Sequence, residues 1–197
     1  MGQAKRRAAE IAKWVDSLST EERKIAETAD RLLNRVLKPM GATGMCYRMT
    51  FFLHLYLAEL GIQTTPVIGY INDGTDDIMI SHAWLDYKGK KTDITLANTQ
   101  DLDINPIGQV VVLDRVLHNG HVYSYHPDQS AKGLAAEVGM LSDPESAGVV
   151  HMKRAEHIAM TARAKDASVM RTFLDAAPDR MHFEMLKAVV DKILIIK

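Results

Sequence analysis

The sequence predicts an α+β fold in which a layer of helices packs on a small antiparallel sheet, with extra C-terminal helices. Apolar residues recur at helical spacing over residues 4–60, whereas residues 63–125 contain short β-branched runs separated by turn signals. The composition becomes helical again from residue 128 onward. A chain of 197 residues suits one domain with room for a modest appendage.

Composition and charge limit the classes of protein to which the chain can belong. The formal net charge is −1, so no overall basic charge favours nucleic acid as a partner. The single cysteine excludes an internal disulfide, which fits a reducing compartment. The sequence contains neither a signal-peptide pattern nor a stretch of about 20 apolar residues. We therefore expect a cytoplasmic protein that interacts with neither membranes nor nucleic acids.

Two helices are predicted before residue 40. The first covers residues 4–18. The second begins at Ser19 or Thr20, either of which is a good N-cap before the acidic residues that follow. It is expected to run to about Leu37 and to be ended by Pro39. Both helices are expected to cover the next one, which is too apolar to be exposed.

That next helix covers residues 46–61 and is the predicted centre of the fold. Apolar side chains surround it almost completely, namely Met49, Phe52, Leu53, Leu55, Tyr56, Leu57 and Leu60. Gly61 is a natural residue to end it. Cys46 lies at its first turn, where unpaired N–H groups and the positive end of the helix dipole favour a thiolate.

Residues 63–71 are predicted to form a strand, and residues 72–77 form an acidic loop after it. This loop is interpreted either as the border of a groove for a basic peptide or an amine, or as a solvated turn. Residues 78–87 and 90–96 then read as the two strands of a hairpin, with His82 on the first strand and Asp93 on the second.

The register of this hairpin decides whether His82 and Asp93 can meet. With Lys88 and Gly89 as the turn, the two residues are diagonal neighbours on one face, roughly 7–8 Å apart at Cβ. Shifting the turn back by one residue on each side places them directly opposite one another. A three-residue loop would instead send Asp93 to the other face.

Further strands are predicted at residues 108–113 and 116–125, the latter with an Asn119-Gly120 turn. The histidines nearby are too loosely spaced for a metal site, so no metal is expected there: His118, His121 and His126. A helix is expected to begin at Asp143-Pro144 and to extend past Ala162, with Ala176 as its furthest end, and another is expected to begin at Pro178-Asp179.

Cys46, His82 and Asp93 together supply a nucleophile, a base and a group to orient the base. Each has an ordinary explanation on its own. A buried cysteine is usually a small core residue, a strand histidine is usually structural, and an aspartate often caps a turn. The combination, in this order and with this predicted geometry, favours a catalytic triad.

Three segments resemble the transglutaminase-like branch of the papain-like cysteine enzymes: Gly44-Met45-Cys46-Tyr47-Arg48, His82-Ala83-Trp84 and Asp93-Ile94-Thr95. Bacterial peptidases that cut leader sequences from lasso peptides look similar over the same part, about residues 40–100. The resemblance implies that Cys46 is the nucleophile, His82 the general base and acid, and Asp93 the orienter. No cofactor is expected, and no motif identifies a side chain for an oxyanion hole.

The chain is expected to divide into two parts. Residues 1–127 would form the transglutaminase-like core with N-terminal helices. The resemblance does not extend to residues 128–197, whose composition predicts a helical extension packed on the core. The expected function is a cysteine peptidase or amide hydrolase acting on a peptide or protein substrate. Two alternatives remain open from the sequence: a transglutaminase-type acyltransferase that uses an amine acceptor, and a non-catalytic binding module on the same fold.

Overall fold

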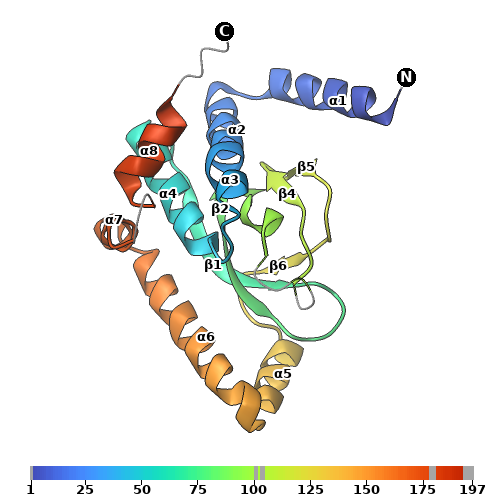
Figure 1. Cartoon of the computed structure of the whole chain (residues 1–197), viewed down its shortest axis with the longest axis vertical. Coiled ribbons are helices and arrows are strands. Elements are labelled where there is room, and N and C mark those ends of the chain that lie inside the picture. Colours follow the sequence, from blue (N-terminus) through green and yellow to red (C-terminus); the bar gives the residue numbers. More distant parts are fainter. Residues whose placement is uncertain (1, 100–101, 103–104, 178–180, 193–197) are drawn as a thin grey trace.

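The computed structural model describes residues 2–99, 102, 105–177 and 181–192. It is a mixed α/β structure in which helices pack on a small, curled antiparallel sheet (Figure 1). Its elements in chain order are α1 (Gln3–Ser17), α2 (Thr20–Leu32), the π-helix η1 (Leu33–Leu37), α3 (Lys38–Met40), α4 (Cys46–Glu59), β1 (Thr65–Asn72), β2 (Ile80–Tyr87), β3 (Lys90–Thr92), the 3-10 helix η2 (Thr95–Ala97), β4 (Val110–Val112), β5 (Arg115–His118), β6 (Ser124–His126), α5 (Ala131–Leu141), α6 (Pro144–Arg163), α7 (Ala167–Asp175) and α8 (Phe183–Asp191).

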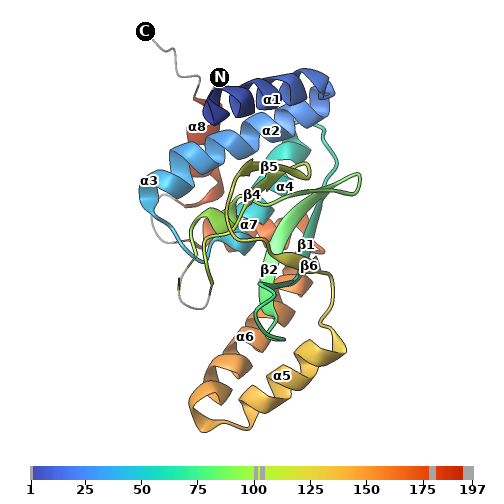
Figure 2. The same ribbon diagram turned by 90° about the vertical axis from the view of Figure 1, so that its right-hand side faces the viewer.

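Helix α4 is the centre of the core, as predicted. It packs on β1 and β2, while α2, α7 and α8 contact its remaining sides (Figures 1 and 2). Phe51 meets Phe173 of α7 edge-on, with ring centroids 5.7 Å apart, and Phe52 lies 5.3 Å from the ring of Phe183 on α8. Gly61 has a φ of 77° and ends the helix in the left-handed conformation expected of it.

The second helix begins as predicted but ends later. Ser19 and Glu22 form a reciprocal capping box at the start of α2. Pro39 does not end the helical segment, which continues to Met40 and stops at Gly41, where φ is 56°. The wider π-helical turn of η1, just before the proline, changes the hydrogen-bond spacing there, so the missing N–H of the proline is tolerated.

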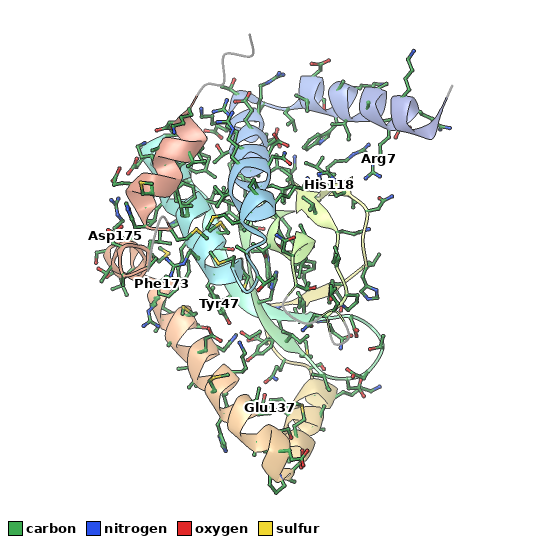
Figure 3. All side chains as sticks on the ribbon, in the orientation of Figure 1. Arg7, Tyr47, His118, Glu137, Phe173 and Asp175 are labelled. Carbon is green, nitrogen blue, oxygen red and sulfur yellow. The ribbon has the colours of Figure 1, made fainter. Side chains whose placement is uncertain are left out.

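The expectation that both N-terminal helices cover α4 is confirmed only for α2. Helix α1 lies beside β5 instead, where Arg7 donates a hydrogen bond of 2.9 Å to the carbonyl of Leu117 (Figure 3). The side chain of His118 lies close to that of Arg7 in Figure 3. Among the described residues, no helix has the length and apolar character needed to cross a lipid bilayer.

The main sheet has the strand order β3-β2-β1-β6, with all neighbours antiparallel. The hairpin adopts the first of the predicted registers, with Tyr87 opposite Lys90 and with positive φ at Lys88 and Gly89 (52° and 79°). The ladder is shorter than predicted, because Asp93 leaves β3 to pair with Val111 of the second, two-stranded sheet.

The predicted strand at residues 116–125 with an Asn119-Gly120 hairpin turn is wrong. Strand β5 pairs with β4, and β6 pairs with β1, so the two halves of the predicted strand belong to different sheets. The hairpin turn lies one strand earlier, at Leu113 and Asp114, which have φ values of 50° and 62°. Gly120 serves another purpose: a Cβ there would lie 2.2 Å from the carbonyl oxygen of Gly108.

The C-terminal helices fall into two groups. Helices α7 and α8 join the core around α4, whereas α5 and α6 form a helical hairpin that extends away from it (Figure 2). The helix predicted from Asp143-Pro144 is confirmed as α6, which ends at Arg163. It does not reach Ala176, because Asp166 caps the separate helix α7. The start predicted at Pro178-Asp179 lies outside the described residues.

Candidate active site

His82 and Asp93 form a buried pair. His82 Nε2 lies 2.7 Å from Asp93 Oδ2, and the two residues are only 5% and 2% exposed. His82 is the third residue of β2, and Asp93 follows the last residue of β3. The antiparallel register of the hairpin therefore places both side chains on one face of the sheet, as the sequence predicted.

Asp93 is held from several sides. Its Oδ1 accepts hydrogen bonds from the backbone N–H and the hydroxyl of Thr95, at 2.9 and 2.8 Å, and its Oδ2 also accepts one of 2.8 Å from the Tyr125 hydroxyl. Burial alone would raise the pKa of Asp93, but the charge of His82 and the hydrogen bonds from His82 and Thr95 lower it overall. Asp93 is thus kept ionised in a buried position.

Sequence reasoning missed Tyr125. It lies on β6, which reaches the site only because that strand pairs with β1. Gly69 permits this arrangement, since a Cβ there would lie 2.4 Å from the carbonyl oxygen of His126 and 2.6 Å from the ring of Trp84. No local pattern near Tyr125 indicates such a contact.

His82 is poised to be positively charged. Burial alone would lower the pKa of His82, but the Asp93 carboxylate with its hydrogen bond, and the nearby Cys46 side chain, outweigh burial and raise it. Because Nε2 is bonded to Asp93, the remaining ring nitrogen, Nδ1, is the one available to Cys46.

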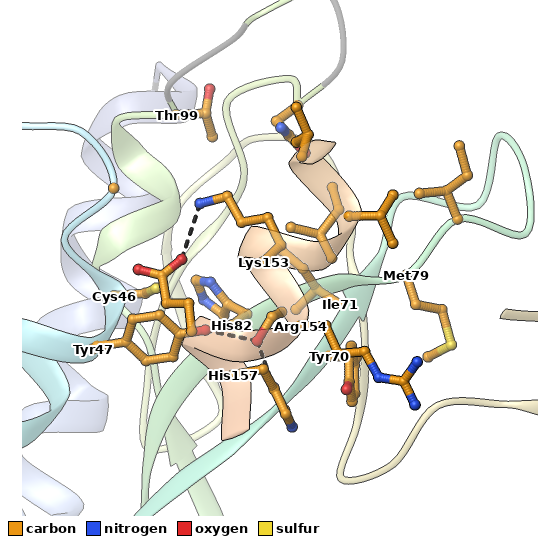
Figure 4. A pocket seen from close by; sticks show the side chains of 18 of the residues that line it. Cys46, Tyr47, Tyr70, Ile71, Met79, His82, Thr99, Lys153, Arg154 and His157 are labelled. Atoms are coloured by element: carbon orange, nitrogen blue, oxygen red, sulfur yellow. Dashed lines mark hydrogen bonds and ion pairs between the residues drawn. The ribbon is translucent and has the colours of Figure 1, made fainter. Parts of the chain in front are cut away.

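Cys46 is the first residue of α4 and is partly exposed. No side chain of the described residues caps this helix terminus. Cys46 and His82 line the same cavity, which has a volume of about 410 Å³ (Figure 4). The structure therefore brings together all three residues that the sequence singled out, with the thiol on one wall and the His82–Asp93 pair beside it.

The cavity has walls from distant parts of the chain. One side is formed by the start of α4 and by β1 and β2, and the opposite side by the α5–α6 hairpin. The acidic loop at residues 72–77 is not part of either side: it folds on itself, with the Asn72 amide donating to the carbonyls of Asp76 and Ile78. Residues 72–77 themselves do not line the cavity, although Ile71 and Ile78 on either side of them do. The interpretation of the loop as a solvated turn fits the structure, and its interpretation as the border of a substrate groove stays a prediction.

A second hydrogen-bonded chain crosses the cavity wall. The Tyr47 hydroxyl lies 2.6 Å from Ser81 Oγ, which lies 2.5 Å from His157 Nδ1 on α6 (Figure 4). The ring of His157 stacks on Tyr70 of β1, with centroids 4.4 Å apart. Burial lowers the pKa of His157, so it is neutral near pH 7. These hydrogen bonds join α6 to α4 and to the sheet. Sequence reasoning missed His157 because no local sequence pattern in α6 indicates such a contact.

Over residues 2–99, 102, 105–177 and 181–192, no group of three or more His, Cys, Asp or Glu side chains lies close enough together to hold a metal ion. His121, one of the three histidines considered above, instead lies 2.7 Å from the carbonyl oxygen of Asp73. No protein-family model, no curated protein and no solved structure matches this chain. The functional argument therefore depends on the geometry of the site.

Proposed function

We propose that this protein is a cysteine enzyme of the papain-like, transglutaminase-like type that breaks amide bonds, and that it acts as a peptidase or amide hydrolase. The observation that carries the proposal is the buried His82–Asp93 pair, whose second imidazole nitrogen is available to a thiol at a helix N-terminus beside a cavity. Burying two charges costs several kcal/mol per ion, roughly, before their attraction is counted. Such pairs in a cavity, beside a potential nucleophile, are typical of functional sites.

The chemistry proceeds in two stages. Cys46 Sγ attacks the carbonyl carbon of the substrate while its proton resides on His82 Nδ1, and a tetrahedral intermediate forms. The C–N bond then breaks, the leaving amine takes the proton from His82, and a thioester to Cys46 remains. Water attacks the thioester after giving a proton to His82, the C–S bond breaks, and the carboxylic acid leaves as the thiol is restored.

Two other groups assist these steps. Asp93 accepts a hydrogen bond from Nε2, which fixes the tautomer of His82 and stabilises the imidazolium. The backbone N–H of Cys46 is at the uncapped start of α4, where it is suited to stabilise the oxyanion of the intermediate. Hydrolysis is proposed over transfer to an amine because the resemblance is greatest to leader-cutting peptidases and the sequence contains no motif for a second substrate.

The test uses an electrophilic amide mimic that reacts with activated thiols, with the adduct measured by intact mass. We expect labelling of Cys46 that is lost in Cys46→Ala and greatly slowed in His82→Ala. His151→Ala is the matched control, because His151 is an exposed histidine of α6 that does not line the cavity. A slow acyl substrate should then give a thioester adduct whose breakdown yields acid in water.

The outcomes separate the classes of function. Conversion of the thioester mainly to an amide product when a primary amine is added would instead indicate an acyltransferase. Equal labelling of the wild type and His82→Ala would remove His82 from the chemistry. If a folded protein formed no adduct with any probe, the binding-module alternative would replace the enzyme.

A further inference from the structure

The cavity beside Cys46 is larger than the triad alone requires. Its volume of about 410 Å³ falls in the range of roughly 300–1,000 Å³ that is typical of small-ligand sites. It extends from Cys46 and His82 to the α5–α6 hairpin, so a group bound at the far wall would be continuous with one that reacts at the thiol. The chemistry of that far wall therefore bears on what the substrate carries.

The wall away from the thiol is mainly apolar. Its apolar side chains come from β1, the segment before β2, η2, α5 and α6, and they include Ile71, Met79, Leu96, Met140, Val149 and Val150. The charged side chains that α5 and α6 contribute to the cavity are paired with one another. Lys153 Nζ lies 3.1 Å from Glu156, and Arg154 lies 3.7 Å from Glu137. The two basic side chains thus already have acidic partners, and the wall offers mainly apolar surface to a ligand.

Two residues on the η2 side of the cavity, Thr99 and Asn105, each carry a side-chain oxygen that has no hydrogen-bond partner within the described part of the chain. Both oxygens are shielded from solvent, so a ligand in the cavity would reach them only if neighbouring side chains moved. The apolar wall is therefore the surface that the cavity offers to a ligand.

We propose that the cavity formed with the α5–α6 hairpin is a specificity subsite that binds a bulky apolar side chain of the peptide substrate. This inference rests on the proposed function, because it assigns the cavity to the substrate that Cys46 attacks. The acidic loop at residues 72–77, which suggested a basic substrate, lies outside this cavity. The expected preference is therefore for apolar side chains over charged ones of equal length.

The test measures how fast three thiol reagents alkylate Cys46: iodoacetamide, N-hexyl iodoacetamide and N-(5-aminopentyl) iodoacetamide. Each rate is divided by the rate of the same reagent with a small free thiol. We expect the hexyl reagent to exceed iodoacetamide by roughly tenfold or more, because its chain is buried in the apolar cavity. The aminopentyl reagent has a similar length but carries a charge, and should show no such gain.

Two matched pairs of variants locate the effect. Val149 lines the cavity and Met152 does not, although both are on α6 and are 53% and 57% exposed. Val149→Glu should abolish the hexyl gain, and Met152→Glu should keep it. On α5, Met140→Glu should likewise abolish the gain and Val138→Glu keep it, since Met140 lines the cavity and Val138 does not.

The outcomes distinguish this proposal from the proposed function. A labelling rate that depends on His82 but shows no hexyl gain overturns the subsite alone. A hexyl gain in a protein whose labelling does not depend on His82 overturns the enzyme mechanism alone. A gain that survives both Val149→Glu and Met140→Glu, or that is lost equally in the control variants, places the apolar contact elsewhere and overturns the subsite.

Discussion

Two helices that line the cavity are built in opposite ways. Helix α4 has 14 residues, eight of which are buried, whereas α6 has 20 residues, of which only Val150 and Met160 are buried. Helix α4 carries Cys46, and α6 carries His157 and much of the opposite wall. A helix with few buried contacts opens locally at low free energy, while one in the core does so only with global unfolding. Cys46, the proposed nucleophile, is therefore on the rigid side of the cavity, and the wall that we propose meets the substrate is on the adaptable side.

The largest expected effect is on the rigid side. Asp93→Asn should slow labelling of Cys46 by an amide-mimic probe by about 10⁴-fold. The new amide group would donate to His82 Nε2, so the proton of a neutral imidazole would move to Nδ1, and that nitrogen could no longer accept the thiol proton. The fold should persist with reduced thermal stability, because Oδ1 can still accept from Thr95.

Asp86→Asn is the matched control for this change. Asp86 is on the same hairpin, and its carboxylate accepts a hydrogen bond from Gly89 in the turn. Circular dichroism should show both variants folded. An unchanged labelling rate in Asp93→Asn, or an equal loss in Asp86→Asn, would contradict the role assigned to Asp93.

A smaller effect on the same side is the pH dependence of stability. The pKa of His82 is raised in the folded state from 6.5, so between about pH 7 and 9 the folded protein holds a proton that the unfolded chain has lost. Unfolding free energy should therefore fall as pH rises, by up to ~1.4 kcal/mol per pH unit. Urea titrations in a Cys46→Ala background, where no thiol titrates, would measure this slope.

The other shifted histidines act with the opposite sign and at lower pH. Burial lowers the pKa of His54, His118 and His157, so their contribution to stability is lost only as pH falls below about 6.5. His82→Gln should remove the slope between pH 7 and 9. A slope that persists in this variant would mean that another group supplies it.

The smallest expected effect is on the adaptable side. His157→Leu removes the hydrogen bond to Ser81, and should lower the free energy of unfolding by only about 1 kcal/mol. Amide hydrogen exchange should become faster in α6 and stay unchanged in α4, because the hydrogen-bonded side chains Tyr47, Ser81 and His157 join α6 to the core.

Ser81→Ala removes this bond and also the bond to the Tyr47 hydroxyl, and should likewise make exchange in α6 faster. His151→Leu on the exposed face of α6 should change nothing. Faster exchange in α4 as well would show that the two helices are one cooperative unit, and the contrast between them would fail.

The sequence predicted the parts of the site that local signals specify. The apolar circumference of α4, the glycine after it and the two-residue turn at Lys88-Gly89 were sufficient to place Cys46, His82 and Asp93 correctly. The sequence predictions fail where another constraint on the backbone outweighs the local signal. Pro39 predicts the end of a helical segment that the π-helical turn of η1 allows to continue. Asn119-Gly120 predicts a turn, but Gly120 instead permits the close approach of the backbone at Gly108.

The sequence by itself determined the central helix, the capping box and the register that puts His82 and Asp93 on one face, because each depends on residues within about 15 positions of one another. Only the tertiary structure decided that Tyr125 bonds Asp93 and that His157 bonds Ser81, 76 residues away in the chain. Those contacts depend on the pairing of β6 with β1 and on the packing of α6 against the sheet. A side chain in a short strand or an exposed helix has the same local pattern whether or not such a partner exists, so the cavity became visible only in three dimensions.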